Sequence, residues 1–251
     1  MEYNNRHNRE RLRILQAYQA RSASEPDRSS FFGHESAAHV LRLQERYRVT
    51  LKLLTQNNLA SLHNKQILDV GCGTGVQLLE YLQWDAQPEL LSGIDMRKVC
   101  VEQCRKVLPD VEIRRGCATE LPWPNQYFDI VSQQTVFSSI LSDAMRTDVA
   151  QEMMRVLKPD GIILWYDNLR VNPNNRNVRA VSQQELGKLF PGFRYQKRFI
   201  TFLPHIARRI PVAALEYCHP FLSSFPGCRT HLLVLMKRSE TIPPSVIIYN
   251  I

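Results

Sequence analysis

Three glycines at alternate positions, Gly71, Gly73 and Gly75, are the residues whose types and spacing most directly indicate chemistry. They follow an apolar run, Ile67–Val70, that is typical of a buried strand, and they precede Val76–Leu82, which is typical of a helix. Glycine tolerates a positive φ and lets a ligand approach where a Cβ would block it. The helix behind such a loop directs free N–H groups at the ligand. The pattern predicts a strand–loop–helix nucleotide site of the doubly wound type.

The spacing also indicates which nucleotide would bind. The loop reads G-x-G-x-G, whereas a dinucleotide site reads G-x-G-x-x-G. A second predicted strand, Leu90–Ile94, is followed by Asp95, and a carboxylate there suits the two hydroxyls of a ribose. No arginine immediately precedes or follows the loop to contact a pyrophosphate. We therefore expect a nucleoside without phosphates, and S-adenosylmethionine is such a ligand.

Four segments in order resemble the motifs of class I S-adenosylmethionine-dependent methyltransferases. They are Asp69–Gly75, Gly93–Met96, Gly116–Pro122 with Tyr127–Val131, and Leu157–Leu164, and together they cover roughly residues 65 to 167. The resemblance implies S-adenosylmethionine as the cofactor. It also implies an α/β, Rossmann-like fold, with a seven-stranded, mostly parallel sheet, helices on both faces and an antiparallel last strand. N-terminal helices would then close over the cofactor.

The motifs and the carboxyl ends of the predicted strands give the candidate cofactor contacts. These are Tyr18, Arg21, Asp69, Gly71, Cys72, Gly73, Gly75, Asp95, Met96, Cys117, Ala118, Thr119, Gln133, Gln134 and Ser138. The resemblance suggests Tyr18 and Arg21 for the cofactor carboxylate, with a solvated helix face as the alternative for Arg21. Most family members have Asp where Cys117 stands. A thiol is a weak acceptor for the adenine amino group, so a backbone carbonyl or Thr119 is the alternative.

Candidates for the chemical step follow the predicted fifth strand and flank the pocket. Asp167 is the best-placed carboxylate to orient an acceptor or take its proton, although it could instead cap the following loop. His34 and His205 are the further candidate bases, each with a structural role as the alternative. An Asp-Asn pair at this place holds magnesium in some catechol O-methyltransferases. Here Gln133 and Gln134 stand where a partner carboxylate is needed, so we expect no metal.

Composition narrows the class of protein less than the motifs do. The chain has 251 residues, a net charge of +8 and a pI near 9.3, which permits contact with nucleic acid or a membrane surface but requires neither. There is no apolar run of 18 residues, and only the short Ile206–Ile210 segment suggests peripheral membrane contact. The six cysteines are scattered, which favours reduced thiols in the cytoplasm.

The predicted elements divide the chain into three parts. Residues 1–60 form an N-terminal helical lid, 61–238 form the methyltransferase domain, and 239–251 form an extended tail. Helices and strands alternate through the domain, as expected for a parallel sheet. Residues 203–227, before the last strand, are too long for a hairpin loop and predict an insertion that covers the acceptor site.

These features favour a methyltransferase that acts on oxygen or nitrogen of a small-molecule acceptor. Thr135–Ile140 and Arg229–His231 resemble bacterial enzymes of surface-glycan or specialised-metabolite pathways. A nucleic-acid methyltransferase is the alternative, but Ser132–Thr135 lacks the Asn/Asp-Pro-Pro-aromatic sequence of DNA amino-methylating enzymes, and no separate nucleic-acid module is visible. A non-catalytic cofactor-binding scaffold is the third interpretation. The sequence does not indicate an oligomeric state.

Overall fold

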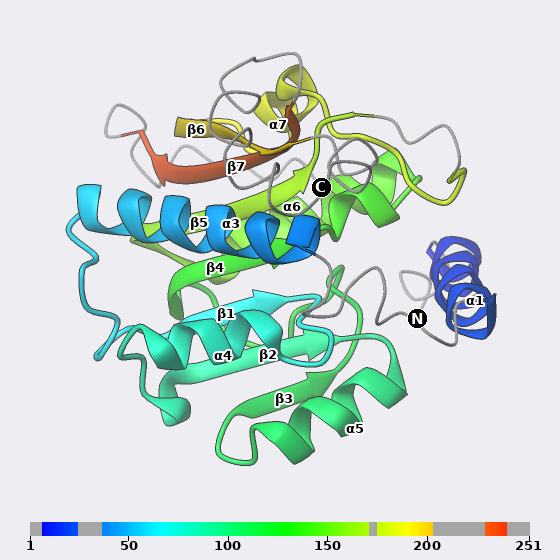
Figure 1. The fold of residues 1–251 in the computed structure, drawn as a ribbon, viewed down its shortest axis with the longest axis horizontal. Coiled ribbons are helices and arrows are strands. Elements are labelled where there is room, and N and C mark those ends of the chain that lie inside the picture. The colour runs from blue at the N-terminus through cyan, green and yellow to red at the C-terminus, as the bar shows by residue number, and fades with distance from the viewer. Residues whose placement is uncertain (1–6, 25–36, 171–174, 203–228, 240–251) are drawn as a thin grey trace.

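A seven-stranded sheet forms the centre of the molecule in the computed structural model, which describes residues 7–24, 37–170, 175–202 and 229–239 (Figure 1). The strand order is β3-β2-β1-β4-β5-β7-β6. The strands are β1 Ile67–Val70, β2 Leu91–Asp95, β3 Glu112–Arg115, β4 Phe128–Gln134, β5 Leu157–Asn168, β6 Phe193–Phe202 and β7 Arg229–Arg238. Strands β3, β2, β1, β4 and β5 pair in parallel, and β7 runs antiparallel to both β5 and β6. This architecture confirms the predicted fold class.

Helices cover both faces of the sheet, which explains why the inner strands β1 and β2 are buried along their whole length. The helices are α1 Asn8–Ser24, α3 Ala37–Gln56, α4 Val76–Gln83, α5 Lys98–Val107, α6 Asp143–Val156 and α7 Gln183–Leu189, with short 3₁₀ turns at Pro88–Leu90 and Phe137–Ser139. Two cores result. Leu53 of α3, Leu78 of α4 and Val101 of α5 belong to one. Met153 of α6 and Leu186 of α7 belong to the other.

The two helices of the predicted N-terminal lid have different positions. Helix α3 lies on the sheet face, where it contacts β6 and β7 and buries Leu53 and Leu54 completely. Helix α1 stands beside the edge toward which the arrows of β1, β2 and β4 point (Figure 1). Within the predicted lid, α1 is thus the described helix at the carboxyl edge. The predicted insertion and nearly all of the predicted tail lie outside the described residues.

The sheet topology locates the expected ligand site. Strand β1 pairs with β2 on one side and with β4 on the other, so the strand order reverses between β1 and β4. Ligands of open α/β sheets bind at the carboxyl ends of the strands beside such a reversal. The glycine loop follows β1 and Asp95 ends β2, so both lie at this edge.

Candidate functional site

The three glycines of the loop adopt the backbone that the sequence predicts. Their φ values are +72° at Gly71, +57° at Gly73 and +91° at Gly75, all in the region that side chains rarely adopt. A Cβ on Gly71 would lie 2.4 Å from Cγ2 of Val136, and one on Gly75 would lie 2.8 Å from the Cys104 sulfur. Packing therefore requires two of the glycines. The middle one, Gly73, faces no backbone atom within 4 Å.

Asp95 lies directly beside this loop. Its carboxylate is 5% exposed, and its Oδ2 accepts a hydrogen bond from the backbone N–H of Gly73 at 3.0 Å. A buried carboxylate next to a glycine with an open side fits a nucleoside, whose ribose supplies two neighbouring hydroxyl donors. The loop and Asp95 together therefore fit S-adenosylmethionine.

A half-buried apolar rim surrounds the loop. Tyr18, Met96, Ala118 and Val136 all pack at the edge of one core. Cys117 is buried beside them, and its sulfur accepts a hydrogen bond from the Thr119 hydroxyl at 3.2 Å. The Thr119 hydroxyl proton is thus already used within the protein. Apolar walls of this kind suit an adenine ring.

Cys72 and Asp69 point into the protein rather than toward the rim. The hydrogen bond with Cys104 raises the pKa of the Cys72 thiol, and burial raises it further. Asp69 is buried, and its Oδ1 accepts from the Ser132 hydroxyl at 2.9 Å, across the β1–β4 pair. Burial raises the pKa of Asp69 to about 7. This carboxyl therefore braces the two strands at the point where the strand order reverses.

The polar residues after β4 hold their own loop in place. Gln133 is fully buried, donates to the Tyr166 carbonyl at 3.3 Å and accepts from the Val136 N–H at 2.9 Å. Thr135 has a φ of +56°, which is unusual for a β-branched residue and marks strain of the kind found at functional sites. Cofactor contacts by Gln133, Gln134 and Ser138 remain predictions.

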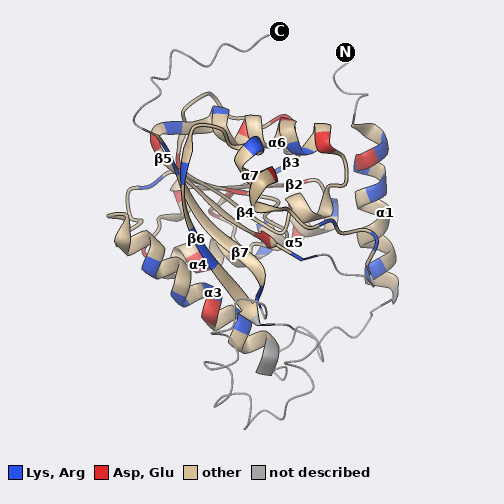
Figure 2. Ribbon diagram, turned by 90° about the horizontal axis from the view of Figure 1, so that it is seen from above, with Lys and Arg blue, Asp and Glu red and all other residues tan. Residues whose placement is uncertain are grey.

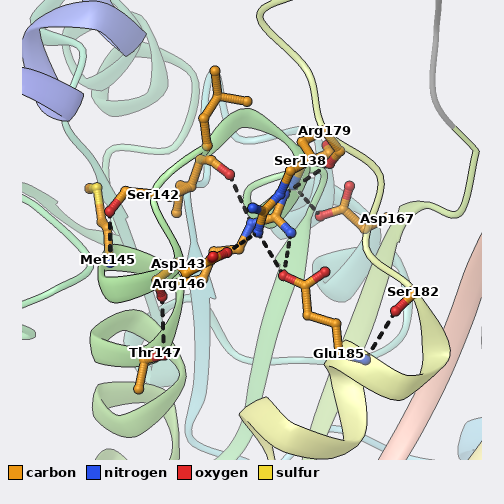
Figure 3. A network of polar contacts seen from close by, with 12 residues as sticks. Ser138, Ser142, Asp143, Met145, Arg146, Thr147, Asp167, Arg179, Ser182 and Glu185 are labelled. Atoms are coloured by element: carbon orange, nitrogen blue, oxygen red, sulfur yellow. Dashed lines mark hydrogen bonds and ion pairs between the residues drawn. The ribbon is translucent and has the colours of Figure 1, made fainter.

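Asp167 is completely buried behind this loop (Figure 3). Its oxygens accept from the backbone N–H of Ser138 at 3.1 Å and from that of Asn168 at 2.8 Å. Burial raises the pKa of the Asp167 carboxyl to about 6. Since its oxygens face two backbone amides, Asp167 anchors the loop that borders the predicted acceptor site.

The remaining predicted site residues are placed as follows. Tyr18 donates to or accepts from the Ser139 hydroxyl at 3.0 Å, and the guanidinium of Arg97 lies 4.4 Å from the centre of its ring. Arg21 is half-buried in the last turn of α1. His34 and His205 lie outside the described residues.

A small cavity lies between α3, α4, the carboxyl ends of β4 and β5, and Leu233 in the middle of the antiparallel β7. Gln134 and Tyr166 line it, together with Arg46, which is 2% exposed and paired with Glu80 at 2.5 Å. Gln77 also lines it, and its side-chain nitrogen is buried without a hydrogen-bond partner. The cavity therefore combines hydrogen-bond donors with an aromatic wall.

Sequence reasoning missed two arginines of this site. Arg46 occupies the buried face of a helix that otherwise shows an ordinary apolar pattern, and its partner Glu80 is distant in sequence, so periodicity gives no sign of the pair. Arg97 forms an ion pair with Asp95 at 2.8 Å. Its position two residues after that carboxylate is the signal that could have found it. Across the described ranges, no three His, Cys, Asp or Glu residues are grouped as a metal would require.

Comparison with known proteins identifies the class of the domain. Residues 67–161 match the family model of a methyltransferase domain. A phthiotriol/phenolphthiotriol dimycocerosates methyltransferase from Mycobacterium tuberculosis is 34% identical over 116 residues, which cover 45% of this chain and 40% of that protein. Protein arginine N-methyltransferase 2 from Xenopus laevis is 31% identical over 122 residues, covering 47% and 28%.

A solved structure agrees at the level of the fold. An S-adenosylmethionine-dependent methyltransferase from Mesorhizobium loti superposes with a TM-score of 0.55 at 17% identity, covering 74% of this chain and 96% of that one. This chain therefore contains a class I S-adenosylmethionine-dependent methyltransferase domain, as the four motifs predict. The match spans less than half the length of the two curated relatives. No helix in the described part of the chain is both long and apolar enough to cross a membrane.

Proposed function

We propose that this protein transfers a methyl group from S-adenosylmethionine to an oxygen or nitrogen of a small organic acceptor. The observation that carries the proposal is the pairing of Gly73 with Asp95. The glycine loop after β1 and the carboxylate ending β2 are joined by a direct hydrogen bond. This arrangement supports binding of an unphosphorylated nucleoside, and the matched domain class supports methyl transfer.

The chain's own residues would bind and position rather than react. When bound, the cofactor supplies an activated methyl group on its sulfonium. Asp95 would accept from the ribose hydroxyls, and the N–H groups of the glycine loop and of α4 would face the rest of the ligand. The loop after β4, held by Gln133 and Asp167, would exclude water and orient the acceptor.

The acceptor is proposed to enter beside the carboxyl ends of β4 and β5, next to the middle of β7. Support comes from the cavity there, where the side-chain nitrogen of Gln77 lacks a partner and Tyr166 offers an aromatic wall. His34 and His205 remain the proposed bases. The buried hydrogen bonds of Asp167 favour a positioning role for it over proton transfer.

The two relatives differ in the acceptors that their names give. One name refers to dimycocerosates and the other to protein arginine. The basis for proposing a small molecule is that Thr135–Ile140 and Arg229–His231 resemble bacterial enzymes of surface-glycan or specialised-metabolite pathways. The oxygen or nitrogen that accepts the methyl group would lose a proton as it does so.

A nucleic-acid acceptor is the competing proposal, and the net charge of +8 is what favours it. Figure 2 shows Lys and Arg residues on several elements, including α1 and α3, rather than in one stripe. Steep salt-dependent retention of RNA or DNA in a gel shift would favour this alternative.

Transfer of labelled methyl groups into fractionated metabolite extracts tests the proposed function. We expect label in a low-molecular-weight fraction with the wild-type protein and none with Gly73→Val. Label confined to nucleic acid or protein would contradict the small-molecule acceptor. Absence of label in every fraction, despite cofactor binding, would favour a non-catalytic scaffold.

A further inference from the structure

The Asp95 carboxylate has no free lone pair for a ribose. Oδ1 accepts from the backbone N–H of Arg97 at 2.8 Å and from its Nε at 3.0 Å. Oδ2 accepts from the backbone N–H of Gly73 at 3.0 Å and from Nη2 of Arg97 at 2.8 Å. An ionised carboxylate offers about four acceptor sites, and four donors fill them. Two hydroxyls of a ligand can bind Asp95 only if two of these donors leave.

The donors that can leave belong to the Arg97 side chain. The two backbone N–H groups are fixed by the glycine loop and by the start of α5, whereas the side chain is 27% exposed and can rotate toward solvent. Its Nε and Nη2 form a two-pronged donor that bonds both carboxylate oxygens. The 2′- and 3′-hydroxyls of a ribose form a similar pair of neighbouring donors. The guanidinium therefore occupies the position expected for the ribose.

The glycine loop gives an independent indication of the same overlap. Among the described residues other than its two chain neighbours, the only atom within 4 Å of a Cβ built on Gly73 is Nη2 of Arg97, at 3.4 Å. The open side of the central glycine is thus covered by this side chain and not by backbone. A ligand that used the open side of Gly73 would meet the guanidinium first.

Helix α1 holds the guanidinium from the other side. The Tyr18 ring lies 4.4 Å from the Arg97 guanidinium carbon, within the range of a cation–π contact. Helix α1 is itself fixed to the loop after β4, because Arg13 donates to the Ser139 carbonyl at 2.6 Å and Tyr18 bonds the Ser139 hydroxyl. Arg97 is therefore held between the sheet edge and α1.

We propose that Arg97 is an affinity-determining residue that competes with the cofactor ribose for Asp95. The proposal rests on the proposed cofactor. Binding requires the side chain to leave both Asp95 and the Tyr18 ring, so the measured dissociation constant equals the intrinsic one divided by the fraction of molecules in which Asp95 is free. Removing the guanidinium should tighten cofactor binding, which is the reverse of what removing an ordinary contact residue does.

Calorimetric titration with S-adenosylhomocysteine tests this on the full chain. Arg97→Met keeps the length of the side chain but carries no donor, and we expect it to bind about tenfold more tightly than the wild type. Arg97→Gln keeps one donor group and should gain less. Lys98→Ala is the matched control. Lys98 follows Arg97 in sequence, and its side chain is 67% exposed and pairs only with Glu102 in the described structure. Lys98→Ala should bind S-adenosylhomocysteine with an affinity within about twofold of the wild type.

The outcomes separate this proposal from the proposed function. Wild-type binding with equal or weaker binding by both Arg97 variants, each shown to be folded by its melting transition, would overturn the competition and make Arg97 an ordinary contact. A failure of wild type and both variants to bind S-adenosylhomocysteine would instead overturn the proposed function, and this proposal with it. Tighter binding by Arg97→Met, unmatched by Lys98→Ala, would support it.

Discussion

At the scale of single residues, Gly73 is the loop position where a substitution is expected to affect ligand binding more than folding. Gly71 and Gly75 are required by close packing against Val136 and Cys104, whereas in the described structure a Cβ on Gly73 would meet the Arg97 side chain alone. A substitution there fills space on the ligand side of the loop. A residue other than glycine at this φ of +57° would also carry backbone strain on the order of 1–3 kcal/mol.

Gly73→Val is expected to abolish binding of S-adenosylmethionine while leaving a folded protein of lower melting temperature. Calorimetry and thermal melting measure the two effects separately. Gly187→Ala is the control, because a Cβ at that helical position meets nothing within 4 Å and the cofactor loop is unchanged. Wild-type affinity in Gly73→Val would show that the ligand does not approach this glycine.

The raised pKa of Asp167 predicts how the stability of the protein depends on pH. Burial raises its pKa in the folded protein from about 3.8 to about 6, so the folded state holds a proton that the unfolded chain has already lost in this range. Stability from this group is therefore present near pH 4 and lost as pH rises through 6. Asp167→Asn does not titrate and does not lose this contribution. The free energy of unfolding of the variant, relative to wild type, should therefore rise by about 2 to 3 kcal/mol between pH 4 and pH 7.

Urea unfolding across this pH range measures the difference. The lost hydrogen bonds to Ser138 and Asn168 lower the variant's stability at every pH, so the slope and not the offset is the result. Parallel pH profiles for the two proteins would mean that Asp167 is not a buried carboxyl of raised pKa.

At the scale of elements, a network around Arg146 fixes the loop between β4 and α6 to α7 (Figure 3). Arg146 is fully buried and donates to the carbonyls of Ile140 and Arg179, at 2.8 and 2.9 Å, and to Glu185 at 2.6 Å. The side chain thus satisfies two backbone acceptors and one carboxylate at once. The contact of Arg146 with α7 therefore fixes the position of the loop that borders the proposed acceptor site.

Arg146→Ala is expected to destabilise the protein by about 3–5 kcal/mol, because it leaves buried acceptors unpaired. Arg179→Ala should cost less, because Arg179 is about a third exposed and its Asp143 partner is mostly exposed. Thermal or urea unfolding of both variants measures the contrast. Equal losses in the two variants would contradict the central role of Arg146.

The sequence predicts the elements well and the side-chain partners poorly, and Ser182 to Glu185 shows why. The Ser-x-x-Glu spacing predicts a capped helix start here, and the Ser182 hydroxyl does accept from the Glu185 N–H at 3.0 Å. The Glu185 carboxylate, however, pairs with Arg146 and Arg179. A buried guanidinium attracts the carboxylate more strongly than a neutral N–H does. Local patterns contain no information about such a distant partner.

The same division applies to the candidate site. Strand periodicity and glycine spacing locate Gly73 and Asp95, because those features depend on neighbours in sequence. The positions of Arg97 over the loop and of Gln133 within it depend on contacts made only after the sheet and α1 have come together. These orientations could not be predicted from spacing.

At the scale of the whole molecule, the sheet brings the proposed cofactor site and the proposed acceptor site to the same edge. The carboxyl ends of β1 and β2 carry the glycine loop and Asp95, and the carboxyl ends of β4 and β5 border the cavity that Arg46 and Tyr166 line. Methyl transfer by positioning alone requires no metal in this arrangement.

We therefore expect methyl transfer to survive a strong chelator. The Asp167 oxygens already accept two backbone N–H groups, and the neighbouring strand end carries glutamines rather than a second carboxylate. Activity assays with and without chelator, once an acceptor is known, provide the measurement. Loss of activity with recovery on adding magnesium would show that a metal takes part.

Calorimetric titration of the wild-type protein with S-adenosylmethionine, in parallel with NAD, tests the central claim most directly. The account predicts that S-adenosylmethionine binds and NAD does not, and that Asp95→Ala weakens the binding by about 1–3 kcal/mol through the loss of a charged hydrogen-bond acceptor. Tight binding of NAD without any response to S-adenosylmethionine would contradict the account.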